Sequence, residues 1–236
     1  MSDLPLTTSS ARAPIVLVHG AWFGAFCWDR VIAAIDDPSR EIVAVQLRGS
    51  GNRRDENGPH ITREDHVEDV VAAIVGRDLT NVVLVGHSYG GRVITGVIQR
   101  IGERIGRVIY VDAHAPVLDD PGPSDERRAI ADAHGQMLPL MGVRLDAALV
   151  GGADELARIT AMIVDHPFAT LTSPWRAELP DGLERTYVHA LGPDGEPFRC
   201  YARVCADDPR WEYIEIDGPH MLMYSHPREL AAIIAR

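Results

Sequence analysis

Ser88 lies in a segment whose pattern is typical of a catalytic nucleophile. The segment reads VVLVGHSYGG, a buried-strand signal followed by a serine with a glycine two residues away on either side. In a nucleophile elbow a strand turns sharply into a helix, and Gly86 and Gly90 leave the room that this strained turn needs. Apolar residues then recur at helical spacing over 93–101, and Gly102 follows where a helix would end. The pattern predicts that Ser88 attacks a substrate.

A serine hydroxyl is a poor nucleophile at neutral pH and needs a base, which we expect to be a histidine. His220 is the best placed of the ten histidines, because it follows the apolar run 211–216 and precedes the last expected helix. Ligands of open α/β sheets meet such loops at the carboxyl ends of strands. We expect structural roles for His87, inside the turn, and for His19, which should hold its loop by hydrogen bonding. The remaining histidines are expected on the surface or as satisfied core residues, namely His60, His66, His114, His134, His166, His189 and His226.

The carboxylate that would orient the base has two candidates, Asp112 and Asp194. Asp112 ends the apolar strand 107–111, where a carboxylate costs desolvation energy unless it has a partner. Asp194 lies in a Gly-Pro-Asp-Gly turn whose residues are ordinary turn formers. We therefore prefer Asp112 and keep Asp194 as the alternative. Asp217 is too close to His220 in the same loop to be preferred.

The residue after the nucleophile and an early loop could stabilise a negatively charged intermediate. Backbone N–H donors at these two places commonly form an oxyanion hole, and here they would come from Tyr89 and Ala21. The loop 19–28, HGAWFGAFCW, also holds four aromatic residues, which either line an apolar substrate pocket or pack in the core. Of these, we assign Trp22 to substrate binding.

Apolar runs separated by helical patterns predict an α/β fold. Continuous runs of this kind suit strands buried on both faces of a parallel sheet, and they cover 15–18, 42–45, 82–85, 108–111, 186–190 and 211–216. Thr62 and Asp65 form the cap of an amphipathic helix with apolar positions over 67–75, and Pro227 opens the closing helix. This alternation implies right-handed βαβ units and hence a doubly wound, mostly parallel sheet.

The segment 114–180 breaks this alternation. It is rich in proline and glycine, shows helical patterns at 124–134 and 153–164, and carries no strand signal. Long excursions between strands are usually functional, so we expect a small helical cap over the active site. With 236 residues, the chain 1–236 is then expected to be one domain with this inserted cap.

Composition argues against several classes of partner. The formal net charge of -11 is spread along the chain without a basic cluster, so neither nucleic acid nor an anionic membrane is expected as a partner. A signal-peptide pattern and a membrane-length apolar run are both missing, which predicts a cytoplasmic protein. Cys27, Cys200 and Cys205 lack paired spacing, so we expect free thiols and neither a disulfide framework nor a metal site.

Three stretches, VLVHGAWFGAFCW, VLVGHSYGG and a late GPH, resemble the α/β-hydrolase superfamily. Within it, the chain is most similar to small esterases related to plant methylesterases and hydroxynitrile lyases, including bacterial pyrethroid-hydrolase-like members. The resemblance covers 15–234 and is specific at the elbow and the first loop. It implies an α/β-hydrolase fold and the cleavage of small-molecule esters by Ser, His and Asp without a cofactor, with Ser88 and His220 at the matching positions.

The sequence departs from the plant members of that family at the acid. They carry it a fixed distance past the next-to-last strand, where this chain has Pro193, with Asp194 one residue later. Similar bacterial sequences often lack that aspartate and have one at the position of Asp112. The lyases put Thr or Asn directly after the first-loop histidine, and one type adds Lys after the catalytic histidine. Gly20 and Met221 stand at those places, which favours ester hydrolysis over cyanohydrin cleavage.

The sequence thus predicts a serine hydrolase that cleaves a small, largely apolar carboxylic ester or lactone through an acyl-enzyme. Two other functions stay open. One is a lyase or other non-hydrolytic enzyme on the same scaffold, because a fold does not fix a reaction. The other is a ligand-binding, receptor-like protein that retains the pocket.

Overall fold

The computed structural model describes residues 12–119, 122–173 and 178–236, and its centre is a six-stranded sheet in the order β2-β1-β3-β4-β7-β8. All its neighbouring strands run parallel. The strands are β1 (Ile15–Val18), β2 (Ile42–Val45), β3 (Val82–His87), β4 (Ile105–Val111), β7 (Glu184–Ala190) and β8 (Glu212–Ile216). Each of the six predicted runs forms one of them. β1 and β3 are buried along their whole length, as continuous apolar runs require.

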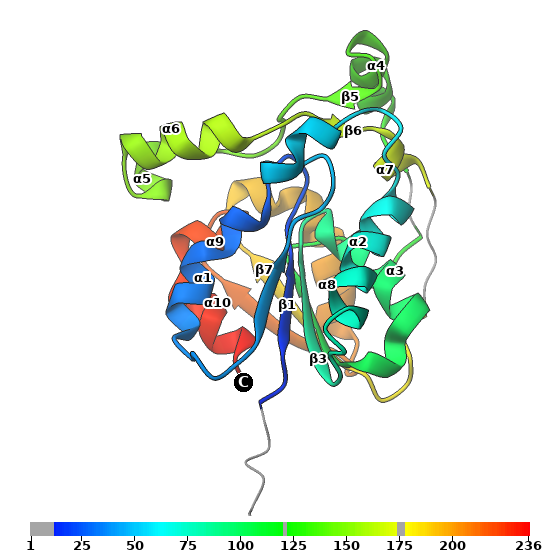
Figure 1. Cartoon of the computed structure of the whole chain (residues 1–236), viewed down its shortest axis with the longest axis vertical. Coiled ribbons are helices and arrows are strands. Elements are labelled where there is room, and N and C mark those ends of the chain that lie inside the picture. Colours follow the sequence, from blue (N-terminus) through cyan, green and yellow to red (C-terminus); the bar gives the residue numbers. More distant parts are fainter. Residues whose placement is uncertain (1–11, 120–121, 174–177) are drawn as a thin grey trace, which may run out of the picture.

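Helices cover both faces of this sheet, so the doubly wound prediction is confirmed. In Figure 1, α1 (Asp29–Ile35) and α10 (Pro227–Ile234) lie on one side, and they pack against each other. The other side carries α2 (Arg63–Val75), α3 (Gly90–Ile101) and α8 (Arg199–Asp207). The predicted cap of α2 is present, since Asp65 N–H donates to Thr62 Oγ1 and Thr62 N–H donates to Asp65 Oδ2.

Several short elements were not expected from the sequence. They include α1, α8 and α9 (Leu222–Ser225), together with the 3-10 turns η1 (Ala25–Trp28), η2 (Gly51–Glu56), η3 (Gly102–Arg104) and η4 (Pro193–Phe198). The turn η3 begins at Gly102, directly after α3, as the predicted helix end requires. The turn η4 contains Asp194, which therefore lies in a helical turn rather than in a simple four-residue turn.

The inserted segment 114–180 contains more than helices. It forms α4 (Asp125–Ala133), β5 (Met137–Leu138), α5 (Ala147–Val150), α6 (Ala153–Met162), β6 (His166–Pro167) and α7 (Ala169–Thr172). The two predicted helices are confirmed as α4 and α6, but the expectation of no strand is wrong, because β5 and β6 pair antiparallel. Each strand has only two residues, too few for an alternating pattern. Positions 120–121 and 174–177 of this segment lie outside the described residues.

The topology brings two loops together where the site was predicted. β1 lies between β2 and β3, so the chain turns to opposite sides of β1 in successive crossovers. Such a reversal opens a crevice at the carboxyl ends of the strands. Val18 pairs with Gly86, which sets the loop after β1 beside the turn after β3. The inserted segment lies beyond this end of the sheet in Figure 1. Within the described ranges, no helix is both long and apolar enough to cross a membrane.

Candidate active site

Ser88 sits on a tight turn between β3 and α3, with a left-handed φ of 54°. Its backbone N–H donates to Val111 O at 3.2 Å, which fixes the turn against β4. A Cβ atom at Gly86 would lie 2.7 Å from Gly90 O, and one at Gly90 would lie 2.8 Å from Val18 O. Both distances are too short for real side chains, so the turn requires glycine at the two predicted positions.

His220 and Asp112 form a buried pair. His220 Nδ1 lies 2.6 Å from Asp112 Oδ2, and Asp112 is completely buried. The backbone N–H of Ala190 donates to the other carboxylate oxygen at 3.3 Å. Burial raises the pKa of Asp112, while the hydrogen bond from His220 opposes this rise. A neutral His220 that donates from Nδ1 carries its free lone pair on Nε2, which is the form a general base needs.

Asp194 holds the same histidine at a different point. Its Oδ1 accepts the backbone N–H of His220 at 3.0 Å. The ring of Phe198 stacks on the His220 ring with centroids 4.8 Å apart and an interplanar angle of 4°. His87 Nε2 lies 3.1 Å from His220 O, so the His87 ring supports the loop that carries His220. This contact fits the predicted structural role of His87. Both candidate acids therefore contact His220, but only Asp112 reaches its ring.

Ser88 and His220 open into one cavity of about 60 Å³, which we call the Ser88 cavity. The other predicted site residues Ala21, Trp22 and Tyr89 also line it. Among the described residues, no turn or loop hydrogen bond uses the backbone N–H of Ala21 or Tyr89. Asp194, the alternative acid, lines it as well, but the sequence did not indicate the rest of the wall, which is formed by His114, Arg127, Met141, Gly142, Val143, Leu171, Pro197 and Phe198. All of these residues belong to the inserted segment or to η4, and of them only Arg127 lies in a helix that the sequence predicts.

Trp22 ties the loop after β1 to the inserted segment. Its indole Nε1–H donates to Leu138 O at 2.8 Å, and its own carbonyl accepts the N–H of Val164 at 3.2 Å. The other aromatic residues of this loop do not line the cavity. Phe23 and Trp28 are buried in the core, and Phe26 packs against it. Core packing therefore explains three of the four aromatic residues.

Neutral histidines surround the Ser88 cavity. His66 Nδ1 lies 2.9 Å from the Tyr89 hydroxyl, His66 Nε2 lies 3.1 Å from Arg48 O, and His166 Nε2 lies 2.7 Å from Thr170 Oγ1. His66 and His166 are thus satisfied core residues, as expected, whereas the position of His114 in the cavity wall was not anticipated. His19 lies 2.8 Å from Gly20 O, which agrees with its predicted loop-holding role.

Burial keeps these rings uncharged. It lowers the pKa of His19 and of His66 to about 4. The pKa values of His87, His114 and His166 are also well below the ordinary value for the same main reason.

Three residues of the site have a strained backbone. Trp22, Ser88 and Asp112 have φ values of 67°, 54° and 40°, in the left-handed region that side chains other than glycine rarely adopt. Each such residue costs on the order of 1–3 kcal/mol and persists only where the surroundings enforce it. The surrounding structure therefore enforces a left-handed residue in the loop after β1, in the elbow after β3 and at the end of β4.

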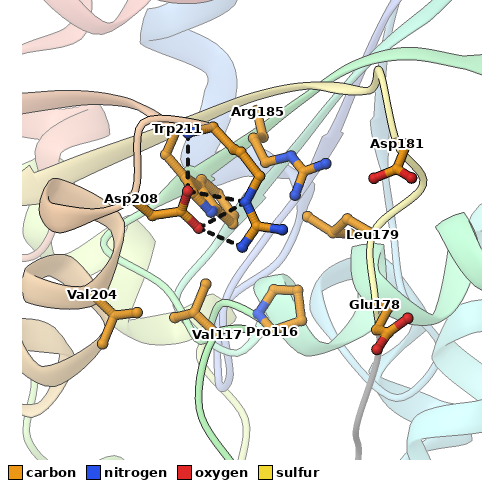
Figure 2. Close-up of a pocket in the computed structure, with 10 residues that line it drawn as sticks. Pro116, Val117, Glu178, Leu179, Asp181, Arg185, Val204, Asp208 and Trp211 are labelled. Carbon is orange, nitrogen blue, oxygen red and sulfur yellow. Dashed lines mark hydrogen bonds and ion pairs between the residues drawn. The ribbon is translucent and has the colours of Figure 1, made fainter.

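A larger hollow lies away from these residues, and we call it the Trp211 hollow (Figure 2). Its volume is about 390 Å³, and its walls are Pro116, Val117, Glu178, Leu179, Asp181, Arg185, Val204, Asp208, Arg210 and Trp211. Arg185 lies over the Trp211 ring at 5.9 Å, and Arg210 pairs with Asp208 at 2.6 Å. These described wall residues include neither a nucleophile nor a base suited to ester cleavage, so the smaller cavity is the candidate active site.

Comparison with known proteins assigns the family. Residues 15–233 match the family described as the alpha/beta hydrolase family. The chain belongs to the α/β hydrolase family. A carbendazim hydrolyzing esterase from Nocardioides sp. is 32% identical to this α/β hydrolase. The matched region covers 94% of this chain and 98% of the relative. Esterase PIR7B from Oryza sativa subsp. japonica is 33% identical and covers 97% of each chain.

A solved structure agrees with this assignment. A pyrethroid hydrolase from Sphingobium faniae superposes with a TM-score of 0.68 at 22% identity, covering 94% of this chain and 96% of that one. This match shows the α/β-hydrolase fold. The predicted resemblance to small plant and bacterial esterases is confirmed, and the relatives support esterase activity on this scaffold.

Proposed function

We propose that this α/β hydrolase is a serine esterase that cleaves a small carboxylic ester through Ser88, His220 and Asp112. The contact of 2.6 Å between His220 Nδ1 and the buried Asp112 carboxylate carries the proposal. It supports an imidazole whose hydrogen lies on Nδ1, which leaves Nε2 to accept a proton, in a cavity that Ser88 also lines.

Each residue has a defined task in this mechanism. His220 Nε2 takes the proton of Ser88 Oγ as that oxygen attacks the ester carbonyl carbon. The backbone N–H groups of Ala21 and Tyr89 donate to the oxyanion of the tetrahedral intermediate. His220 then gives its proton to the leaving alcohol, and the acyl group stays on Ser88. A water molecule attacks the acyl-enzyme with His220 again as the base. Asp112 keeps its charge and stabilises the imidazolium in both steps.

Asp194 acts on the position of His220 and not on its charge. Its carboxylate accepts the backbone N–H of His220, whereas Asp112 contacts the ring. In the proposed mechanism it holds the loop that carries the base, so that the ring stays in line with Asp112.

The walls of the Ser88 cavity support a small and mainly apolar ester. Met141, Val143, Leu171 and Phe198 supply apolar surface, and Trp22 closes the side next to Ala21. Ligand pockets commonly have volumes of roughly 300–1,000 Å³. The Ser88 cavity, at about 60 Å³, is much smaller. We therefore propose that 114–180 acts as a cap on a single-domain hydrolase, and that the cavity widens when substrate binds while the cap residues named here stay in its wall.

The mechanism is tested by comparing the natural protein with Ser88→Ala. The panel contains p-nitrophenyl esters with short and medium acyl chains, simple methyl esters and carbendazim, the compound named for one relative. We expect the variant to lose turnover by about 10⁴-fold or more, because the nucleophile is gone. Mass spectrometry of the natural protein should detect an acyl group on Ser88.

Three other results would contradict the proposal. Equal turnover by Ser88→Ala would exclude Ser88 as the nucleophile. Cleavage of a cyanohydrin without ester hydrolysis would favour a lyase. If neither protein turns over any ester while ligands raise the melting temperature, a receptor-like function is favoured.

A further inference from the structure

One charged side chain in the Ser88 cavity has no task in the proposed mechanism. Arg127 lies in the first turn of α4 and lines the cavity together with Ser88 and His220. Its backbone N–H donates to the hydroxyl of Ser124 at 3.3 Å, which anchors this turn. The residue is half-buried, so its guanidinium group is partly withdrawn from water.

No partner compensates this charge within the part of the chain that the structure describes. The Arg127 side chain makes no hydrogen bond or ion pair there, and the only carboxylate that offsets its charge is the neighbouring Glu126. Other arginines differ clearly, since Arg48 binds Asp69 through several nitrogens and Arg158 binds Glu155. A guanidinium stays protonated and offers five N–H donors in a planar fork. In Arg127 these donors remain available to a ligand.

The groups whose charges interact with Arg127 are Glu126, Arg92 and two neutral histidines. Burial lowers its pKa, and the charge of Arg92, a buried residue of α3, lowers it further. His114 and His166 lie close enough for the Arg127 charge to help lower their pKa values, so both rings stay neutral beside it. The carboxylate in the same wall, Asp194, already accepts the N–H of His220. An anion entering the cavity would therefore find the guanidinium donors of Arg127 not engaged by any described residue.

We propose that Arg127 binds a carboxylate carried by the ester substrate, on the part of the molecule away from the scissile bond. This inference rests on the proposed function, because it assigns the substrate class of the same cavity. A carboxylate fits this single group, since one planar guanidinium matches its two oxygens. The enzyme then prefers half-esters of dicarboxylic acids to neutral esters of the same shape.

A matched pair of substrates tests this preference. The p-nitrophenyl monoester of glutaric acid and p-nitrophenyl 5-methylhexanoate have nearly the same shape, but only the first carries a carboxylate. The ratio of their kcat/KM values is measured for the natural protein, Arg127→Met and Arg127→Lys. We expect Arg127→Met to lower the ratio about 10-fold to 100-fold, mainly through KM, because one charge-assisted bidentate contact is lost. Arg127→Lys should keep part of the preference.

Arg128→Met is the matched control. Arg128 follows in the same helix and is exposed, and it does not line the cavity. Its loss changes the net charge by the same amount, so we expect the ratio to stay as in the natural protein. An equal fall of this ratio in Arg128→Met would show that the loss of any nearby positive charge lowers it, and it would overturn the proposal. An unchanged ratio in Arg127→Met would overturn it as well.

A binding measurement separates this inference from the proposed function. Titration calorimetry of Ser88→Ala with free glutarate needs no turnover, so it remains informative if no ester is hydrolysed. We expect glutarate to bind Ser88→Ala and to bind the double variant Ser88→Ala, Arg127→Met at least about 10-fold more weakly. Equal binding by the two proteins would overturn the role of Arg127 even if ester hydrolysis by Ser88 is established.

Discussion

The Ser88 cavity and the Trp211 hollow differ most in how their polar groups are satisfied. In the Trp211 hollow, Asp208 and Arg210 neutralise each other at the surface, and Arg185 donates to Pro180 O and Leu183 O while it covers the Trp211 ring. The Ser88 cavity has about one sixth of the volume, but there buried groups converge on one histidine. Volume alone would favour the Trp211 hollow over the Ser88 cavity. Strained backbone and buried titratable groups instead support the Ser88 cavity as the site of the proposed reaction.

The largest expected difference between the two regions is in turnover. We expect His220→Ala to lower kcat for a p-nitrophenyl ester by about 10⁴-fold or more, because Ser88 loses its base. Arg210→Gln, in the wall of the Trp211 hollow, should leave kcat within about twofold, since exposed ion pairs contribute little. A comparable loss of kcat in both variants would show that the two hollows act together.

The two aspartates that hold His220 should also differ in their effect on kcat. Asp112→Asn is expected to lower kcat by about 10³-fold to 10⁴-fold, because an amide favours the wrong tautomer of the ring. Asp194→Asn keeps an oxygen that can accept the His220 N–H, so we expect a loss of about 10-fold. Steady-state kinetics of the two variants, with circular dichroism as a check of folding, decides between them. Unchanged kcat in Asp112→Asn would make Asp194 the stronger candidate for the acid.

Acid should destabilise the protein through its buried histidines. The pKa values of His19 and His66 in the folded chain, about 4, are below the ordinary value of 6.5, so protons bind the unfolded chain more readily. The corresponding stability is fully present above pH 6.5 and is lost as the pH falls towards 4, at about 3 kcal/mol for each of the two rings. Asp112 opposes this loss, because burial raises its pKa. The effect of the histidines is larger than that of Asp112, because the pKa values of His87, His114 and His166 are lowered in the same way as those of His19 and His66.

Urea unfolding between pH 7 and pH 4 measures this loss. The free energy of unfolding should fall steeply in the natural protein and less steeply in His66→Gln, which removes one titrating ring. No histidine is among the described residues that line the Trp211 hollow, so Trp211→Phe should leave the slope unchanged. A slope that is the same in all three proteins would contradict the role assigned to the buried rings.

The smallest expected effect concerns the two tryptophans. Trp22→Phe removes the donor to the buried Leu138 O and should lower the free energy of unfolding by about 1–2 kcal/mol. Trp211→Phe keeps an aromatic ring against Tyr110, and we expect a smaller change in the same measurement. If Trp22→Phe is the more stable of the two variants, the bond from Trp22 to the inserted segment contributes little.

The central sheet and the elbow could be predicted because their signals are local. Six apolar runs became six strands, and Gly86 and Gly90 marked the turn at Ser88 before any packing was known. The preference for Asp112 followed from the cost of burying a carboxylate, and the structure brings this residue to the ring of His220. Asp194, the alternative candidate for the acid, contacts only the backbone N–H of His220.

The cavity walls could not be predicted because they depend on tertiary packing. Arg127 belongs to a helix that the sequence did indicate, but nothing local tells which face of that helix meets Ser88. Leu171 and Phe198 come from short elements without a repeating pattern, and β5 and β6 exist only because they pair with each other. The residues that we propose to select the ester are thus the least visible in the sequence.

The left-handed backbone at Ser88 and Asp112 has a consequence for directed evolution. Glycine at Ser88 would relieve an unfavourable φ, so a selection for heat resistance alone would reward the loss of the proposed nucleophile. Glycine at Asp112, in contrast, would leave the buried donors of His220 and Ala190 without a partner. Thermostable variants of this hydrolase should therefore be sought with a simultaneous screen for turnover. Without that screen, the most accessible stabilising changes lead towards a well-folded but inert protein.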